Sequence, residues 1–182
     1  GSSVVAYTFT IFDNAKKAVY TKSADSTLPS NFTWNGKADD GTICPDGQYF
    51  AKLDIKAANG STPSVTTEKF AIDTVAPQLE CEIPWSDFSP DGDGNQDNIP
   101  VTVTKISNEK TWTATVYDAK KAVTKKYTWN GAFSKFEWDG CDESGNRAPD
   151  GLYSMVISST DDAGNSFATE LKNLNLDSRE TK

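Results

Sequence analysis

Phe32-Thr33-Trp34-Asn35-Gly36 and Pro45-Asp46-Gly47-Gln48-Tyr49 are the most informative stretches of this chain, because each occurs a second time. The second copies are Phe136-Glu137-Trp138-Asp139-Gly140 and Pro149-Asp150-Gly151-Leu152-Tyr153, at a constant offset of 104 residues. Around these motifs, residues 15–74 align without a gap with residues 119–178. The sequence is therefore a tandem of one small domain, with a period far longer than that of a solenoid repeat.

The pattern of apolar residues predicts that both copies are built from strands. Tyr7, Phe9 and Ile11 alternate with threonines, and in the second copy Trp112, Ala114 and Val116 do the same. Such alternation indicates half-buried strands, and turn residues such as Asn59-Gly60 separate the runs. We therefore predict an all-β fold, made of two tandem Ig-like β-sandwich domains joined by a short proline-containing linker.

The domain boundaries follow from the repeat. We expect domain 1 at residues 4–74 and domain 2 at residues 78–178, with Pro77 in the linker between them. Residues 78–106 have no counterpart in the first copy. Either the given sequence begins inside domain 1, or domain 1 folds without these strands. We favour a boundary trimmed from a longer repeat protein, and Gly1-Ser2-Ser3 reads as a remnant of cloning.

Composition excludes several classes of function. The net charge of −8 and the pI near 4.5 disfavour nucleic acid and anionic membranes as partners. No apolar run is long enough to insert into a bilayer. Histidine is absent, which removes the usual general base and the commonest metal ligand. We therefore expect a non-catalytic protein.

The three cysteines, Cys44, Cys81 and Cys141, lack the paired spacing of a zinc site. None of them recurs at the offset of 104 residues. A Cys81–Cys141 disulfide and three reduced, partly buried thiols both remain open.

The repeated motifs resemble those of the FlgD Ig-like repeat family. A strand ending in Ile-Phe-Asp or Val-Tyr-Asp precedes W-[ND]-G and P-D-G-x-Y in both copies. Phe88-Ser89-Pro90-Asp91-Gly92-Asp93-Gly94 is similar to the F-[ST]-P-N-G-D-G segment that leads into such repeats, with Asp91 in place of asparagine. The resemblance implies an Ig-like sandwich from an exported bacterial envelope or surface protein, in some cases one that continues into an OmpA-like domain. It does not imply an enzyme.

The repeated aromatic residues have a structural interpretation. Trp34 and Trp138 each end an alternating run before a glycine turn, where a large ring can cap a sandwich core. A sugar-stacking platform is the alternative. Tyr49 and Tyr153 follow the P-D-G turns and are expected to pack while their hydroxyl groups bond nearby backbone.

One segment carries the chemistry of a metal site. Asp91, Asp93, Asn95 and Asp97 present side-chain oxygens at alternate positions, as in the first half of a calcium loop. Calcium needs six to eight oxygens, so backbone, water or Asp87 would have to contribute. The full EF-hand pattern is not present. The alternative is a turn in which these side chains bond local amides. Calcium is the only cofactor that we predict, and we expect it to stiffen domain 2 near the linker.

Two tryptophans lack aromatic counterparts in the first copy and are candidates for partner binding. Trp85 lies beside the acidic segment, and Trp129 lies in Tyr127-Thr128-Trp129-Asn130-Gly131. The acidic turns after each W-[ND]-G and the Lys16-Lys17 and Lys120-Lys121 pairs are interpreted as solvated turns.

We predict a structural spacer or assembly module that is extracytoplasmic: periplasmic, associated with the outer membrane, or on the cell surface. Its partner is expected to be a protein or envelope component. The alternative is an adhesion or carbohydrate-binding module that uses Trp85 or Trp129.

Overall fold

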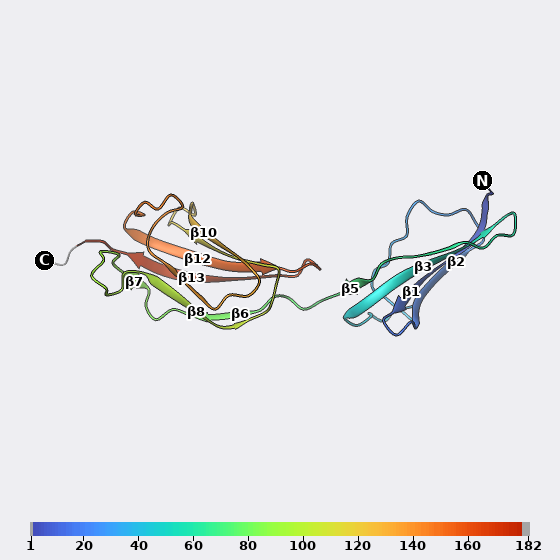
Figure 1. Cartoon of the computed structure of the whole chain (residues 1–182), viewed down its shortest axis with the longest axis horizontal. Coiled ribbons are helices and arrows are strands. Elements are labelled where there is room, and N and C mark those ends of the chain that lie inside the picture. Colours follow the sequence, from blue (N-terminus) through green and yellow to red (C-terminus); the bar gives the residue numbers. More distant parts are fainter. Residues whose placement is uncertain (1, 180–182) are drawn as a thin grey trace. The chain divides into compact units, whose positions relative to one another are not determined.

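The computed structural model describes residues 2–179 and contains strands but no helix in that range (Figure 1). The chain divides into two units, of which the first ends at Thr74 and the second begins at Val75. The all-β, tandem Ig-like fold predicted from the sequence is confirmed. No helix in the described residues could span a membrane.

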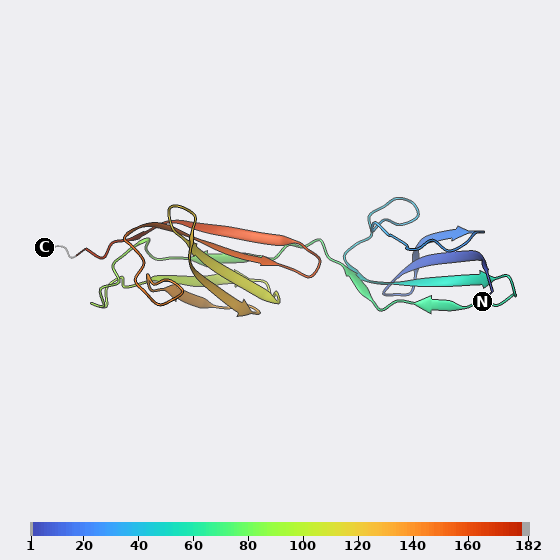
Figure 2. The same cartoon turned by 90° about the horizontal axis from the view of Figure 1, so that it is seen from above.

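Domain 1 contains a single sheet. Its strands are β1 (Val4–Asp13), β2 (Ala18–Ala24), β3 (Gly47–Ala57), β4 (Ser64–Thr66) and β5 (Phe70–Ile72). The sheet order is β2-β1-β3-β4, and β5 also pairs with β3. The long connection between β2 and β3 folds back beside this sheet (Figures 1 and 2). Phe32, Trp34 and Cys44 of this connection pack in the core of domain 1.

Domain 2 is a complete two-layer sandwich. One layer has the order β10-β9-β12-β13-β7 and the other the order β11-β8-β6. The strands run in sequence as β6 (Leu79–Glu82), β7 (Asp87–Phe88), β8 (Ile99–Ile106), β9 (Thr111–Tyr117), β10 (Val123–Asn130), β11 (Lys135–Trp138), β12 (Gly151–Thr160) and β13 (Ser166–Leu176).

The alternation seen in the sequence places the core of each domain. In β9, Trp112, Ala114 and Val116 are fully buried between the layers of domain 2. In β1, Phe9 and Ile11 are buried in the smaller core of domain 1. Leu79, Phe88, Ile99 and Val101 add to the core of domain 2 from strands β6, β7 and β8. Within residues 2–179, domain 1 has no equivalent of these three strands, so its core is thinner.

The chain is fastened where it leaves domain 1 and where it enters domain 2. The Asp46 carboxylate accepts hydrogen bonds from the backbone N–H (2.9 Å) and the hydroxyl (3.0 Å) of Thr74. On the other side, Gln78 and Ser107 exchange hydrogen bonds of 2.9 Å. Val75, Ala76 and Pro77 are the only residues between these two anchor points.

Candidate functional site

The acidic loop Asp91–Asp97 joins β7 to β8 and lies beside the segment that leaves domain 2. The Asp177 N–H donates to the Phe88 carbonyl at 3.1 Å, which brings the end of β13 against the start of this loop. Between them is an open depression of about 360 Å³ lined by residues that include Asp91, Asp93, Asn95 and Arg179. From the sequence, we expect a metal in this loop to stiffen domain 2 near the linker. That placement was wrong, because β7 pairs with the final residues of β13.

All three carboxylates of the loop accept hydrogen bonds from the loop's own backbone. Asp97 accepts hydrogen bonds from the N–H groups of Gly92 (2.7 Å) and Gly94 (2.8 Å). Asp91 accepts from Asp93 N–H at 3.0 Å, and Asp93 accepts from Asn95 N–H at 2.7 Å. These are the local turn contacts of the alternative interpretation. The loop therefore has a defined shape without requiring an ion.

The same geometry also gathers the predicted ligands. One carboxylate oxygen from each of Asp91, Asp93 and Asp97 lies within 4.8 Å of the other two. Asn95 and Asp87 line the same depression, although Asp87 accepts a hydrogen bond of 2.9 Å from the Asn175 amide. Three carboxylates fall short of the six to eight oxygens of a calcium shell. Calcium binding stays a prediction.

Hydrogen bonding stabilises the ionised form of Asp97 in the loop and of Asp177 in the segment that leaves domain 2. The Gly92 and Gly94 amides lower the pKa of Asp97 below its ordinary value, because they stabilise the ionised carboxylate. Arg179 donates to both carboxylate oxygens of Asp177 and lowers its pKa to about 2. Both groups are therefore ionised at neutral pH.

The two candidate partner-binding tryptophans are both packed against domain 2. The indole N–H of Trp85 donates to the Asn98 carbonyl at 2.8 Å, and the ring packs against the core. Trp129 stacks on Phe133, with ring centroids 4.0 Å apart, and its other contacts are Tyr127 and Phe136. Burial raises the pKa of Tyr127, and the nearby Asp139 raises it further. Each tryptophan therefore has a packing role in the fold.

The repeated tryptophans and tyrosines take the predicted structural roles. The indole N–H of Trp138 donates to the Cys141 carbonyl (2.9 Å), and that of Trp34 donates to the Lys37 carbonyl (2.7 Å). Trp138 is fully buried, whereas Trp34 is only half-buried. The difference reflects the missing second layer of domain 1.

The acidic segments that follow W-[ND]-G and the two lysine pairs lie in turns, as the sequence indicates. A depression of about 690 Å³ in domain 1 is lined by residues that include Asp13, Asp39, Asp40 and Asp46. Each of these four carboxylates accepts a hydrogen bond from a backbone N–H. In the lysine pairs, Lys16 and Lys121 adopt positive φ angles of 64° and 65° at the turns after β1 and β9.

The three cysteines are free thiols, so the Cys81–Cys141 bridge is not formed. Burial raises the pKa of each of the three thiols above its ordinary value. None of them has the lowered pKa of a reactive cysteine.

One feature that we did not infer from the sequence is the role of the aspartate in P-D-G. Asp150 accepts hydrogen bonds from the backbone N–H (3.0 Å) and the hydroxyl (2.7 Å) of Ser178, as Asp46 does from Thr74. The alignment of the two copies contains a signal for this contact. Asp73-Thr74 and Asp177-Ser178 are separated by the same 104 residues as the two P-D-G motifs. In each domain, we call the two hydrogen bonds that this aspartate accepts, from the N–H and the hydroxyl of Thr74 or Ser178, the exit clamp.

Comparisons with known proteins give the following. Among solved structures, a tetra-tandem repeat from the extending region of a large adhesion protein aligns at 20% identity and a TM-score of 0.41, covering 98% of this chain and 43% of that chain. A structure of a 1.5-MDa bacterial ice-binding adhesin aligns at 16% identity and a TM-score of 0.38, covering 97% and 55%.

The FN1–FN3 domains of chicken CNTN1 align at 13% identity and a TM-score of 0.38, covering 95% of this chain and 57% of that chain. The chain thus spans about half the length of each of these three structures. Curated proteins gave no match.

Family comparison agrees with the motifs and with the sandwich they build. The matching stretch begins at Phe88, at the start of the acidic segment, and includes both the W-D-G and the P-D-G turns of the second copy. Residues 88–163 of this chain match the model of the FlgD Ig-like domain family.

Proposed function

We propose that the chain is a non-catalytic spacer module in which two Ig-like domains hold other parts of an exported bacterial envelope or surface protein at a set distance. The observation that carries this proposal is the exit clamp, which recurs in both domains at corresponding positions. A clamp that fixes where the chain leaves a domain is of use when the next segment must start from a defined point.

The short linker supports the same role. Thr74 is held by Asp46 and Gln78 is held by Ser107, so three residues separate two anchored positions. Pro77 fixes its own φ and biases Ala76 towards extended backbone. Such a linker has far fewer conformations than a flexible linker rich in glycine and serine.

The chemistry of the surface supports a structural role over catalysis. The carboxylates that line the depression of domain 1 accept hydrogen bonds from backbone amides, and the chain contains no histidine. Glycan or partner binding by Trp85 and Trp129 has less support, because both rings have packing partners in domain 2.

A distance measurement between the domains tests the spacer role. Two spin labels, one on each domain of a cysteine-free variant, should give one narrow distance distribution by electron–electron resonance. Inserting six glycine and serine residues after Val75 should broaden it. A distribution that is already broad without the insertion would refute the spacer role. A matched insertion at the tip of the Asn59-Gly60 turn controls for loss of stability.

A further inference from the structure

The chain contains three Asn-Gly sequences, Asn35-Gly36, Asn59-Gly60 and Asn130-Gly131, and all three asparagines are exposed. Asparagine is a thermolabile residue, and it loses ammonia most readily when glycine follows it. The backbone nitrogen of the glycine attacks the side-chain amide carbon, and glycine has no Cβ atom to hinder the approach. The reaction needs a free glycine N–H and is favoured by a donor that stabilises charge on the side-chain oxygen.

The three glycine amides differ in their hydrogen bonding. Gly60 N–H donates to the Ala57 carbonyl at 2.9 Å, and Gly131 N–H donates to the Lys110 carbonyl at 3.1 Å. Within residues 2–179, the N–H of Gly36 donates to no protein acceptor. A hydrogen bond holds the proton on the nitrogen and fixes the peptide plane, so a bonded amide must open before it can attack. Of the three glycines, Gly36 is therefore the one whose nitrogen is available in the folded chain.

The side chain of Asn35 is folded back over its own backbone. Its Oδ1 accepts a hydrogen bond of 3.2 Å from the N–H of Lys37. This bond closes a ring that contains the Asn35 Cγ atom and the Gly36 peptide, so it keeps Cγ beside the attacking nitrogen. The same N–H stabilises the negative charge that develops on Oδ1 as the new bond forms. The local turn therefore both orients and activates the Asn35 side chain.

Asn59 makes the same kind of turn and serves as an internal comparison. Its Oδ1 accepts hydrogen bonds from the N–H (3.1 Å) and the hydroxyl (2.7 Å) of Ser61. It therefore matches Asn35 in exposure and in the bonding of its side-chain oxygen. It differs in its nucleophile, because Gly60 N–H is bonded to Ala57. A difference in rate between the two asparagines thus reports the effect of that hydrogen bond.

Domain 2 shows that these features belong to the W-[ND]-G turn itself. Asp139 takes the place of Asn35 there, and it accepts a hydrogen bond of 3.0 Å from the Cys141 N–H. Asp139 is exposed, and within residues 2–179 the Gly140 N–H has no hydrogen-bond acceptor. Domain 2 has both layers of its sandwich, so neither feature depends on the single sheet of domain 1. An aspartate formed at position 35 also fits the turn, since domain 2 already has aspartate at this position.

We propose that Asn35 is a site of spontaneous deamidation in the folded chain and that the fold protects Asn59 and Asn130. Hydroxide removes the Gly36 proton, the nitrogen bonds to Asn35 Cγ, and the Cγ–Nδ2 bond breaks as water returns a proton to the departing ammonia. Water then opens the cyclic imide. Breaking the new Cγ–N bond gives aspartate, and breaking the original peptide bond to Gly36 gives isoaspartate. The proposal holds whether or not the chain acts as a spacer.

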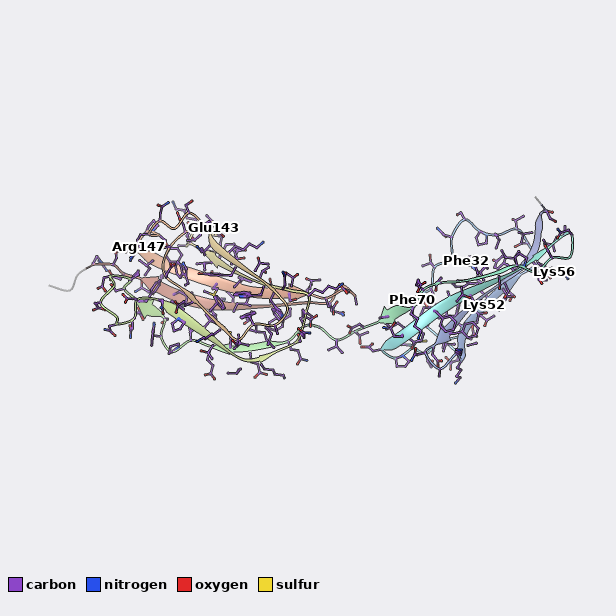
Figure 3. All side chains as sticks on the ribbon, in the orientation of Figure 1. Phe32, Lys52, Lys56, Phe70, Glu143 and Arg147 are labelled. Carbon is purple, nitrogen blue, oxygen red and sulfur yellow. The ribbon has the colours of Figure 1, made fainter. Side chains whose placement is uncertain are left out.

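The two products differ in their effect on domain 1. Isoaspartate lengthens the main chain by one carbon between Trp34 and Gly36. The bond from the Trp34 indole N–H to the Lys37 carbonyl, 2.7 Å long, spans this point. Phe32 lies on the same connection and stacks on Phe9 with ring centroids 4.6 Å apart, which limits how far the connection can shift (Figure 3). We therefore expect isoaspartate to loosen Trp34, whereas aspartate leaves the main chain unchanged.

Peptide mapping of the full 182-residue chain tests the proposal. The folded chain is incubated at mildly alkaline pH and digested with trypsin, which places the three asparagines on separate peptides, 23–37, 57–69 and 127–135. Mass spectrometry follows their conversion, and fragment ions distinguish Asn35 from Asn31. We expect Asn35 to convert roughly tenfold faster or more than Asn59 and Asn130, because their glycine amides must first open. Equal rates, or a faster Asn59, would overturn the proposal.

The same incubation in urea shows whether the fold sets this order. Urea removes the turn hydrogen bonds, so the three rates should converge. A ratio of rates that is the same in urea and in buffer would mean that the neighbouring sequence sets the order, and it would overturn the structural assignment.

Two variants connect the chemistry to its effect on the fold. Asn35→Gln forms the corresponding larger ring much more slowly, so conversion of peptide 23–37 should stop. Asn35→Asp reproduces one product and should leave the stability of domain 1 unchanged, as Asp139 fits domain 2. After ageing, the Trp34 indole N–H signal in NMR spectra should split in the unmodified chain and stay single in both variants. Continued conversion in Asn35→Gln would refute Asn35 as the site.

Discussion

The hydroxyl of Tyr153 donates a hydrogen bond of 2.6 Å to the carbonyl oxygen of Pro149, four residues earlier in the same turn. Tyr49 makes the same bond to Pro45 at 2.7 Å. Both rings are buried, so each bond satisfies a hydroxyl that cannot reach water. The bond ties the P-D-G turn to the strand that follows it.

We predict that Tyr153→Phe destabilises domain 2 by about 1 kcal/mol, because the ring still packs while one buried hydrogen bond is lost. Urea denaturation followed by NMR signals of domain 2 would measure the change. Tyr49→Phe should affect domain 1 by a similar amount and leave domain 2 unchanged. An unaltered midpoint in both variants would contradict a structural role for these bonds.

The pKa of Tyr153 is raised, mainly because burial disfavours the phenolate. Stability from this group is fully present below the unfolded pKa of about 10 and is lost as the pH rises towards the folded value. We expect the midpoint of domain 2 to fall between pH 9 and 11 less steeply in Tyr153→Phe than in the unmodified chain. Parallel curves would show that other groups control the alkaline transition.

The two repeated tryptophans should differ in their importance. Trp138→Ala removes a fully buried ring and is expected to cost about 3–5 kcal/mol in domain 2. Trp34→Ala should cost domain 1 roughly half as much, because less apolar area leaves water when Trp34 packs. Circular dichroism during chemical denaturation would measure both. Equal costs would mean that Trp34 is covered in solution as fully as Trp138 is.

The exit clamp can be opened by one substitution. In Asp46→Ala, the N–H and hydroxyl of Thr74 lose their acceptor, so the segment after β5 should become mobile. We expect ¹⁵N order parameters of Thr74 and Ala76 to fall from about 0.85 towards 0.6. Asp54→Ala, which removes only an exposed ion pair with Lys52, is the matched control. Rigid residues after Asp46→Ala would contradict the clamp.

The acidic loop should respond to pH and to calcium. Because amide hydrogen bonds lower the pKa of Asp97, its contribution to stability is present above the unfolded value of about 4 and is lost as the pH falls through the folded value. Asp97→Asn should therefore flatten the acid limb of the stability curve of domain 2. Calorimetric titration with calcium should release heat in the unmodified chain and not in Asp97→Asn. The absence of heat at millimolar calcium would refute the metal prediction.

The repeat made most of the architecture predictable from the sequence. Alternation along Trp112, Ala114 and Val116 gives a buried face directly, because strand side chains alternate strictly. The tyrosine hydroxyl bonds could also be expected, since a buried hydroxyl after a tight turn has few other acceptors. The local turn contacts of Asp91 to Asp97 follow from the known habits of aspartate and asparagine.

What the sequence could not give was the partner of each long-range contact. Trp85 and Trp129 have no aromatic counterparts in the first copy, which suggested partner binding. The sequence does not show that Trp85 bonds to Asn98 or that Trp129 stacks on Phe133. The position of the acidic loop was misjudged for the same reason. It depends on the parallel pairing of β7 with the end of β13, and these elements are almost ninety residues apart (Phe88 and Leu176).

The exit clamp also gives a rule for dividing longer sequences of this type. In both domains the hydroxyl residue follows the clamping aspartate by 28 positions, because strands β3 to β5 and β12 to β13 return the chain to its turn after the same number of residues. A P-D-G motif with threonine or serine 28 positions after its aspartate therefore marks the point at which the chain leaves a domain. A protein fragment that ends just after that residue would keep the clamp, whereas a fragment that ends a few residues earlier would lose it.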